Sequence, residues 1–177
     1  ARVVHLSSGA HRGAPAEGVL LSLEAINNPT AVGAYARYGM AKLANLVFSE
    51  ELARRKPQLL SNAIHPGVVA SDMLREANFA SMLGAPLGRA VFSLARARNA
   101  LFAYSTAEAS ATLLYCAASS EVEKHRVSGA FFVPVAKQWP PHHPKTRDLK
   151  FAAELWNFSD ALLSKVLAPT RREEHAA

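Results

Sequence analysis

The sequence predicts an α/β fold in which about three parallel strands lie among flanking helices. Two short apolar runs, residues 2–6 and 60–64, have the composition of buried strands. The long stretch between them contains an amphipathic helical pattern, and a third apolar run at 129–134 follows another helical stretch. Because strands alternate with helices along the chain, we expect a parallel sheet.

The first predicted strand, residues 2–6, ends in two serines. Its nearly uninterrupted apolar, β-branched composition suits a strand buried on both faces. Ser7 and Ser8 then fall at the carboxyl end of the strand, the edge where open α/β folds bind ligands. Capping of a turn is the alternative role for these hydroxyls. The polar connection that follows, residues 9–33, places His11 on a surface loop.

A helix is predicted over residues 34–56, and Pro57 ends it. Tyr38 and Lys42 are four residues apart, so they lie on one face of this helix, a single turn apart. A fixed ammonium beside a phenol favours the phenolate and suits proton transfer at neutral pH. The alternative is a half-buried tyrosine beside a solvated lysine. An apolar stripe on the same helix consists of Leu43, Leu46 and Val47.

The second predicted strand, residues 60–64, ends in His65-Pro66-Gly67. Proline and glycine at the end of a strand force an abrupt turn, and glycine lets the backbone approach a ligand closely. A plain turn without a ligand is the alternative.

The second half of the chain predicts two more helices. Ser105 and Glu108 form a capping box, so a helix should run from there to about residue 118. A closing amphipathic helix is marked by its apolar positions Leu149, Ala152, Ala153, Trp156 and Leu163. His142 and His143 lie between prolines, and because adjacent histidines seldom converge on one ion, no metal site is predicted.

Composition narrows the classes of partner. The chain has 177 residues, a formal net charge of +6 and a pI of about 9.8. Its basic residues are scattered, and Glu50 with Arg54 and Glu51 with Arg55 are spaced as helical ion pairs, so no nucleic-acid surface is predicted. The excess positive charge favours anionic ligands instead. Cys116 is the single cysteine, within an apolar run that predicts a small buried side chain and a reducing compartment.

Three motifs occur in a fixed order: a strand ending in Ser7-Ser8, the helical pair Tyr38 and Lys42, and a strand ending in Pro66-Gly67. Together they resemble the short-chain dehydrogenase/reductase family. The chain is most similar to its retinol-dehydrogenase and WW-domain oxidoreductase-like branch, and the closer resemblance is carried by residues 7–11, 38–48, 65–67 and 155–159.

The resemblance implies the C-terminal half of a doubly wound parallel-sheet Rossmann fold over residues 1–168. Residues 169–177 would then be a disordered polar tail. The glycine-rich half of that fold is missing from this sequence, and half a sheet has an open strand edge that invites self-association or homo-oligomer formation. The isolated chain is therefore expected to show no measurable nicotinamide reduction, because the turn that holds the cofactor pyrophosphate is missing.

By the same resemblance, the chain would belong to an NAD(P)-dependent oxidoreductase that interconverts an alcohol and a carbonyl. Tyr38 would exchange a proton with the substrate oxygen, Ser8 would orient that oxygen, and Lys42 would hold the cofactor ribose. NADP is favoured over NAD by analogy with the branch. The residues implied at the cofactor are Tyr38, Lys42, Pro66, Gly67, Val68, Val69 and Ser71.

In this family the segment corresponding to residues 73–102 covers the substrate. Here it is apolar with scattered arginines, which favours a lipophilic substrate of the retinol, steroid or fatty-aldehyde kind. Peripheral contact with a membrane surface, or packing against the domain, would suit the same composition.

Two functional alternatives stay open. A truncated, catalytically inactive remnant could act as an interaction module through its exposed strand edge, and an epimerase or dehydratase could use the same tyrosine and lysine. No targeting signal is visible, so we expect a cytoplasmic or organelle-associated protein.

Overall fold

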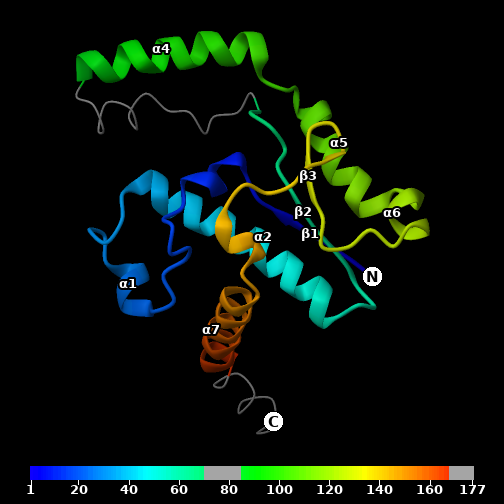
Figure 1. Cartoon of the computed structure of the whole chain (residues 1–177). Helices are drawn as coiled ribbons and strands as arrows, with labels where there is room; N and C mark the ends of the chain where they lie inside the picture. Colours follow the sequence, from blue (N-terminus) through cyan, green and yellow to red (C-terminus); the bar gives the residue numbers. More distant parts are fainter. Residues whose placement is uncertain (70–84, 168–177) are drawn as a thin grey trace, which may run out of the picture.

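The computed structural model describes residues 1–69 and 85–167, in which helices flank both faces of a four-stranded sheet (Figure 1). The strands lie in the order β1 (Arg2–Leu6), β2 (Leu60–Ile64), β3 (Phe131–Val133) and β4 (Lys137–Gln138). β1 pairs parallel with β2, and β2 pairs parallel with β3. The predicted α/β fold with about three parallel strands is therefore confirmed.

The sheet has one strand more than the sequence predicts. After a turn at residues 134–136 the chain reverses, and β4 pairs antiparallel with β3. The run at 129–134 was predicted as the last strand, and this was wrong because β4 follows it. A strand of two residues is too short to show any alternation of polar and apolar side chains.

The helices in chain order are η1 (Gly9–Gly13), α1 (Leu23–Asn27), α2 (Ala34–Arg55), α4 (Ala85–Phe102), α5 (Thr106–Ala118), α6 (Ser120–Lys124), η2 (Pro144–Arg147) and α7 (Leu149–Leu167). None of the helices within residues 1–69 and 85–167 has both the length and the apolarity needed to cross a bilayer. The predicted tail, residues 169–177, lies outside the described residues.

Helix α2 covers one face of the sheet and is itself covered by α7. The predicted apolar stripe of α2 is fully buried. Part of it contacts the sheet and part contacts α7. Leu46 packs against Phe131 of the sheet, whereas Leu43 and Val47 pack against the aromatic and aliphatic side chains of α7. The middle of α2 is therefore held from two sides.

Helix α5 covers the opposite face. It begins with the predicted capping box, in which the Ser105 hydroxyl accepts from the Glu108 N–H and the Glu108 carboxylate accepts from the Ser105 N–H. Cys116 is buried against Ile64 and Phe132, as predicted for a small apolar side chain. Burial raises the pKa of its thiol to about 11.

The ion pairs at the end of α2 differ from the predicted spacing. Glu51 is buried and pairs with Arg55, as expected, but Arg54 also bonds to Glu51 rather than to Glu50. Glu50 instead faces the β3–β4 hairpin, where it lines a pocket of about 400 Å³ together with Phe131. The predicted Glu50–Arg54 pair is wrong because residues 50 and 51 point to different sides of α2.

Burial of Glu50 makes the stability of the fold depend on pH. Desolvation raises the pKa of this carboxyl from 4.5 to about 7. Between those values the folded state binds more protons than the unfolded state, so stability should fall as pH rises through this window. The full effect is about 3 kcal/mol. Thermal unfolding followed from pH 5 to pH 8 should show this decline in the wild type, and Glu50→Gln should remove most of it.

Glu17→Gln is the matched control, because Glu17 is an exposed carboxylate of the same kind. It should keep the wild-type pH profile. Identical profiles for the wild type and Glu50→Gln would contradict the burial of an ionisable group at residue 50.

Candidate functional site

Ser7-Ser8, which follow β1, and His65-Pro66-Gly67, which follow β2, lie side by side at the carboxyl edge of the parallel sheet. The Ser7 N–H donates to the Ile64 carbonyl at 2.8 Å, and the His65 N–H donates to the Phe132 carbonyl at 2.7 Å. These bonds continue the strand ladders past β1 and β2. The serines and the His65-Pro66-Gly67 turn are therefore neighbours in space, as open α/β folds place their ligand-binding residues.

The two serines have different roles. Ser7 is buried, and its hydroxyl donates to the Lys42 carbonyl at 2.7 Å, which ties the end of β1 to α2. Ser8 caps η1: its hydroxyl accepts from the Ala10 N–H at 3.2 Å. A hydroxyl that accepts one hydrogen bond keeps its own proton for donation. Ser8 is half-buried, so it can both cap the turn and donate to a ligand oxygen.

The lysine of the pair is anchored to the sheet. Lys42 Nζ donates to the carbonyl of Leu6 at 3.2 Å, and that carbonyl also accepts from the Asn45 side chain at 3.0 Å. The same ammonium lies 5.6 Å from the centre of the Tyr38 ring. Tyr38 remains 38% exposed. The structure thus fixes a positive charge between the end of β1 and an accessible phenol.

Gly39 allows the close contact between η1 and α2. A Cβ atom at this position would lie 2.8 Å from the Ala10 carbonyl and the Ala14 N, and 2.9 Å from the Gly13 carbonyl carbon. Only glycine allows η1 to cross α2 this closely. Ser8 caps η1 and Tyr38 precedes Gly39 on α2, so this crossing fixes the two elements that carry them against each other. Sequence reasoning missed this residue, although a glycine inside a helical pattern was its signal.

The turn after β2 requires its glycine. Gly67 has φ of +87°, and a Cβ there would lie 2.5 Å from the Tyr104 ring. The Val68 carbonyl accepts from the Tyr104 N–H at 2.9 Å, and Val69 pairs with Tyr104 in a parallel bridge. Pro66 and the 42% exposed Val68 therefore belong to a loop that is held in place from outside the sheet. Ser71 lies outside the described residues.

Comparison with known proteins shows what this arrangement is similar to. No protein-family model matches the chain. Retinol dehydrogenase 12 of Mus musculus is 34% identical over 92% of this chain and 46% of its own length. A WW domain-containing oxidoreductase of Danio rerio is 32% identical over 75% of this chain and 29% of its own length. The chain belongs to the short-chain dehydrogenase/reductase family.

A solved structure agrees with this family assignment. A putative uncharacterized protein from Mycobacterium paratuberculosis superposes with a TM-score of 0.52 at 26% identity, over 91% of this chain and 49% of that one. The chain spans about half the length of the curated relatives it matches. Within the short-chain dehydrogenase/reductase family it corresponds to the C-terminal portion, as the sequence predicts.

In this family member His11 is not on a surface loop, and that prediction is wrong. His11 is 2% exposed, and its ring meets Phe131 edge-on at 5.4 Å. Its Nδ1 donates to the Ser8 carbonyl at 2.7 Å, and its Nε2 accepts from the His142 N–H at 3.4 Å. Burial lowers the pKa of the ring, so it is neutral and holds the Ser8 backbone in place. Residues 9–33 are mostly polar, and this composition gives no indication that His11 packs against the distant Phe131.

The adjacent histidines of the late loop diverge. His142 Nε2 accepts from the Trp139 indole at 2.8 Å, whereas His143 is buried and its Nε2 donates to the Pro15 carbonyl at 3.1 Å. Among the residues that the structure describes, no group of three His, Cys, Asp or Glu side chains could hold a metal ion. These histidines stabilise the loop around η2.

Proposed function

We propose that this chain forms the substrate-facing half of an NAD(P)-dependent oxidoreductase that interconverts an alcohol and a carbonyl. The observation that carries the proposal is the anchored ammonium: Lys42 Nζ is bonded to the end of β1 and lies beside the exposed ring of Tyr38. This fixes a charge next to a phenol, which is what proton transfer to a substrate oxygen needs.

Each of the three residues has one task in this proposal. Tyr38 gives its phenolic proton to the substrate oxygen during reduction and takes it back during oxidation. Ser8 donates its hydroxyl proton to the same oxygen and stabilises the charge that develops there. Lys42 places its positive charge beside the Tyr38 ring, 5.6 Å from the ring centre.

The residues present fit the nicotinamide end of the cofactor. Lys42 offers ammonium protons to ribose hydroxyls, and the loop of Pro66, Gly67, Val68 and Val69 borders the same edge of the sheet. When bound, the nicotinamide accepts or supplies the hydride. NADP is the form we favour, on the analogy with the branch, and the loop would hold its carboxamide.

A lipophilic substrate is supported by helix α4. The helix extends away from the sheet (Figure 1), and its Leu87 and Leu94 are 55% and 73% exposed. Exposed leucines on an amphipathic helix suit contact with an apolar molecule or a membrane surface. We place the protein in a reducing compartment, in the cytoplasm or at an organelle.

The proposed function is tested with the natural gene product that carries this chain. Nicotinamide absorbance is followed with retinal, long-chain aldehydes and a short hydrophilic aldehyde, with NADPH and with NADH. We expect turnover with at least one apolar carbonyl, and kcat/KM that rises with the length of the aldehyde chain. If neither NADPH nor NADH is oxidised with any of these carbonyls, the proposal is rejected.

A second candidate function rests on β1. Among the described strands it pairs on one side only, with β2, and its residues are half-buried or exposed whereas those of β2 are buried. An open edge of this kind can pair with a strand of another chain. Sedimentation would measure self-association of the chain. Self-association in a protein that shows no turnover would favour this interaction role.

A further inference from the structure

A second pocket opens next to the candidate site, on the α2 side of the sheet. It has a volume of about 290 Å³ and lies between η1, the end of β2 and the β3–β4 hairpin. Gly9 and His65, the neighbours of Ser8 and Pro66, form one wall. Phe131 and Trp139 also line the pocket and supply apolar surface. A cavity of this size fits a small organic molecule rather than a large one.

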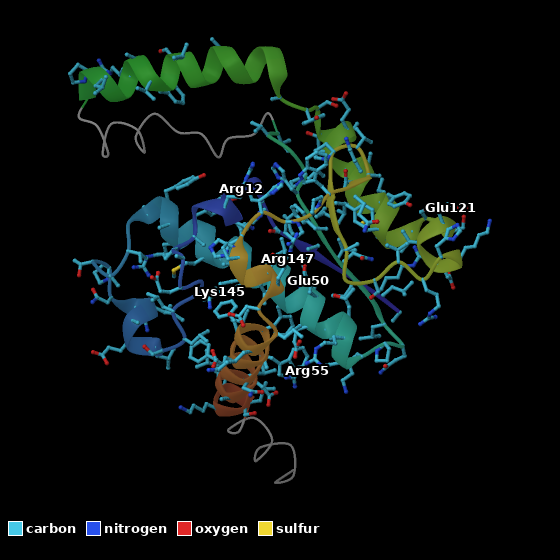
Figure 2. The ribbon with its side chains drawn as sticks, in the orientation of Figure 1. Arg12, Glu50, Arg55, Glu121, Lys145 and Arg147 are labelled. Carbon is cyan, nitrogen blue, oxygen red and sulfur yellow. The ribbon has the colours of Figure 1, made fainter. Side chains whose placement is uncertain are left out.

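The pocket is lined by positive charge. Arg12 and Lys137 both border it, and among the described residues that line it none is an aspartate or glutamate. Arg12 is on η1 (Figure 2). Its Nε donates to the Gly9 carbonyl at 3.2 Å, so the side chain folds back over Gly9. Lys137 Nζ lies 4.8 Å from the centre of the Trp139 ring. Two cations that share a pocket without a carboxylate favour an anionic ligand.

His65 adds a neutral donor beside Arg12. Its Nδ1 accepts from the Gly67 N–H at 3.3 Å, so the proton of the neutral ring is on Nε2. Burial, together with His11 and Arg12, lowers the pKa of His65, which agrees with a neutral ring. His65 Nε2 and Arg12 Nη2 each lie 3.4 Å from the position that a Cβ on Gly9 would occupy. The two donors therefore converge over the glycine.

We propose that this pocket binds a small organic anion, with a carboxylate or phosphate on the donors of Arg12, His65 and Lys137 and an apolar body against Phe131 and Trp139. The planar guanidinium suits two oxygens of one group. The inference goes beyond the proposed function and does not depend on it. The anion is either a charged end of the substrate or a separate small molecule, and the kinetic test below distinguishes the two.

The test measures binding of benzoate by the purified protein, through tryptophan fluorescence and calorimetry. Benzyl alcohol is the neutral probe of the same shape, and inorganic phosphate is the probe without an apolar body. We expect benzoate to bind at least about tenfold more tightly than benzyl alcohol, because charged partners strengthen a hydrogen bond. Equal affinities for the two aromatic probes would overturn the proposal.

Variants locate the site. Arg12→Gln and Lys137→Gln should each lower the affinity for benzoate about tenfold and leave the affinity for benzyl alcohol unchanged. Lys124→Gln removes the same charge from exposed α6, away from the pocket, and should leave benzoate binding unchanged. A loss of benzoate affinity in Lys124→Gln equal to that in Arg12→Gln would show a non-specific charge effect and reject the site.

Kinetics distinguish the two sources of the anion. If the pocket holds a charged end of the substrate, benzoate should compete with a carboxylated aldehyde and not with a neutral one. If it holds a separate molecule, benzoate should change turnover of both aldehydes alike. The binding measurements stand in either case, so failure of the proposed enzymatic function leaves them interpretable.

Discussion

Replacing Tyr38 with phenylalanine is expected to lower kcat of the natural gene product by about 10²- to 10⁴-fold. The variant keeps the ring that faces the Lys42 ammonium and loses only the hydroxyl that exchanges the proton. Binding of the cofactor should stay nearly unchanged, because the main change is in the transition state. Steady-state kinetics beside calorimetric titration with NADPH would measure both quantities.

Tyr35→Phe is the matched control for this substitution. Tyr35 lies one turn earlier on α2, is 63% exposed, and has Gly39 rather than a lysine four residues on. Its loss of a hydroxyl should leave kcat at the wild-type value. Full activity of Tyr38→Phe, or an equal loss in both variants, would remove Tyr38 from the chemistry.

The second large effect is expected at Gly39. Alanine there would place a Cβ 2.8 Å from two backbone atoms of the η1 segment, and backbone cannot move aside as a flexible side chain can. We expect Gly39→Ala to destabilise the fold by about 1–3 kcal/mol, even though alanine is the better helix former. The same displacement should move Ser8 and reduce activity.

Thermal and denaturant unfolding measure this effect. Gly33→Ala is the control, because no atom lies within 4 Å of a Cβ at Gly33 and its φ is −64°. That variant should change stability by less than about 1 kcal/mol. A Gly39→Ala protein at least as stable as the wild type would contradict the close crossing of η1 over α2.

The parts of the fold that local pattern determines were predictable. The apolar runs indicate the strands β1 and β2, but the predicted burial is right only for β2. The prediction that β1 is buried on both faces was wrong, because β1 pairs on one side only among the described strands and its residues are half-buried or exposed. The predicted helix 34–56 differs from the observed Ala34–Arg55 by one residue, because Pro57 marks its end. The hairpin to β4 was not predictable, since two residues carry no pattern. The burial of His11 was missed because its partner Phe131 lies far along the chain.

The candidate site likewise has features that the sequence predicts and features that only the fold reveals. The spacing of Tyr38 and Lys42 fixes their common helix face from sequence alone. The hydrogen bond from Lys42 to Leu6 joins residues 36 positions apart, and only the folded chain reveals it. Arg12 and Lys137 likewise come from η1 and β4, so their common pocket had no signal in the sequence.

The central claim is that hydride and proton reach one substrate carbon–oxygen bond at Tyr38. Its most direct test supplies the natural gene product with a reduced nicotinamide cofactor that carries deuterium at the transferable position, together with an apolar aldehyde. The account predicts an alcohol with one deuterium on the carbinol carbon for each cofactor oxidised, and loss of this product in Tyr38→Phe. A product without deuterium, as an epimerase or dehydratase would form, or equal labelling by Tyr38→Phe, would contradict it.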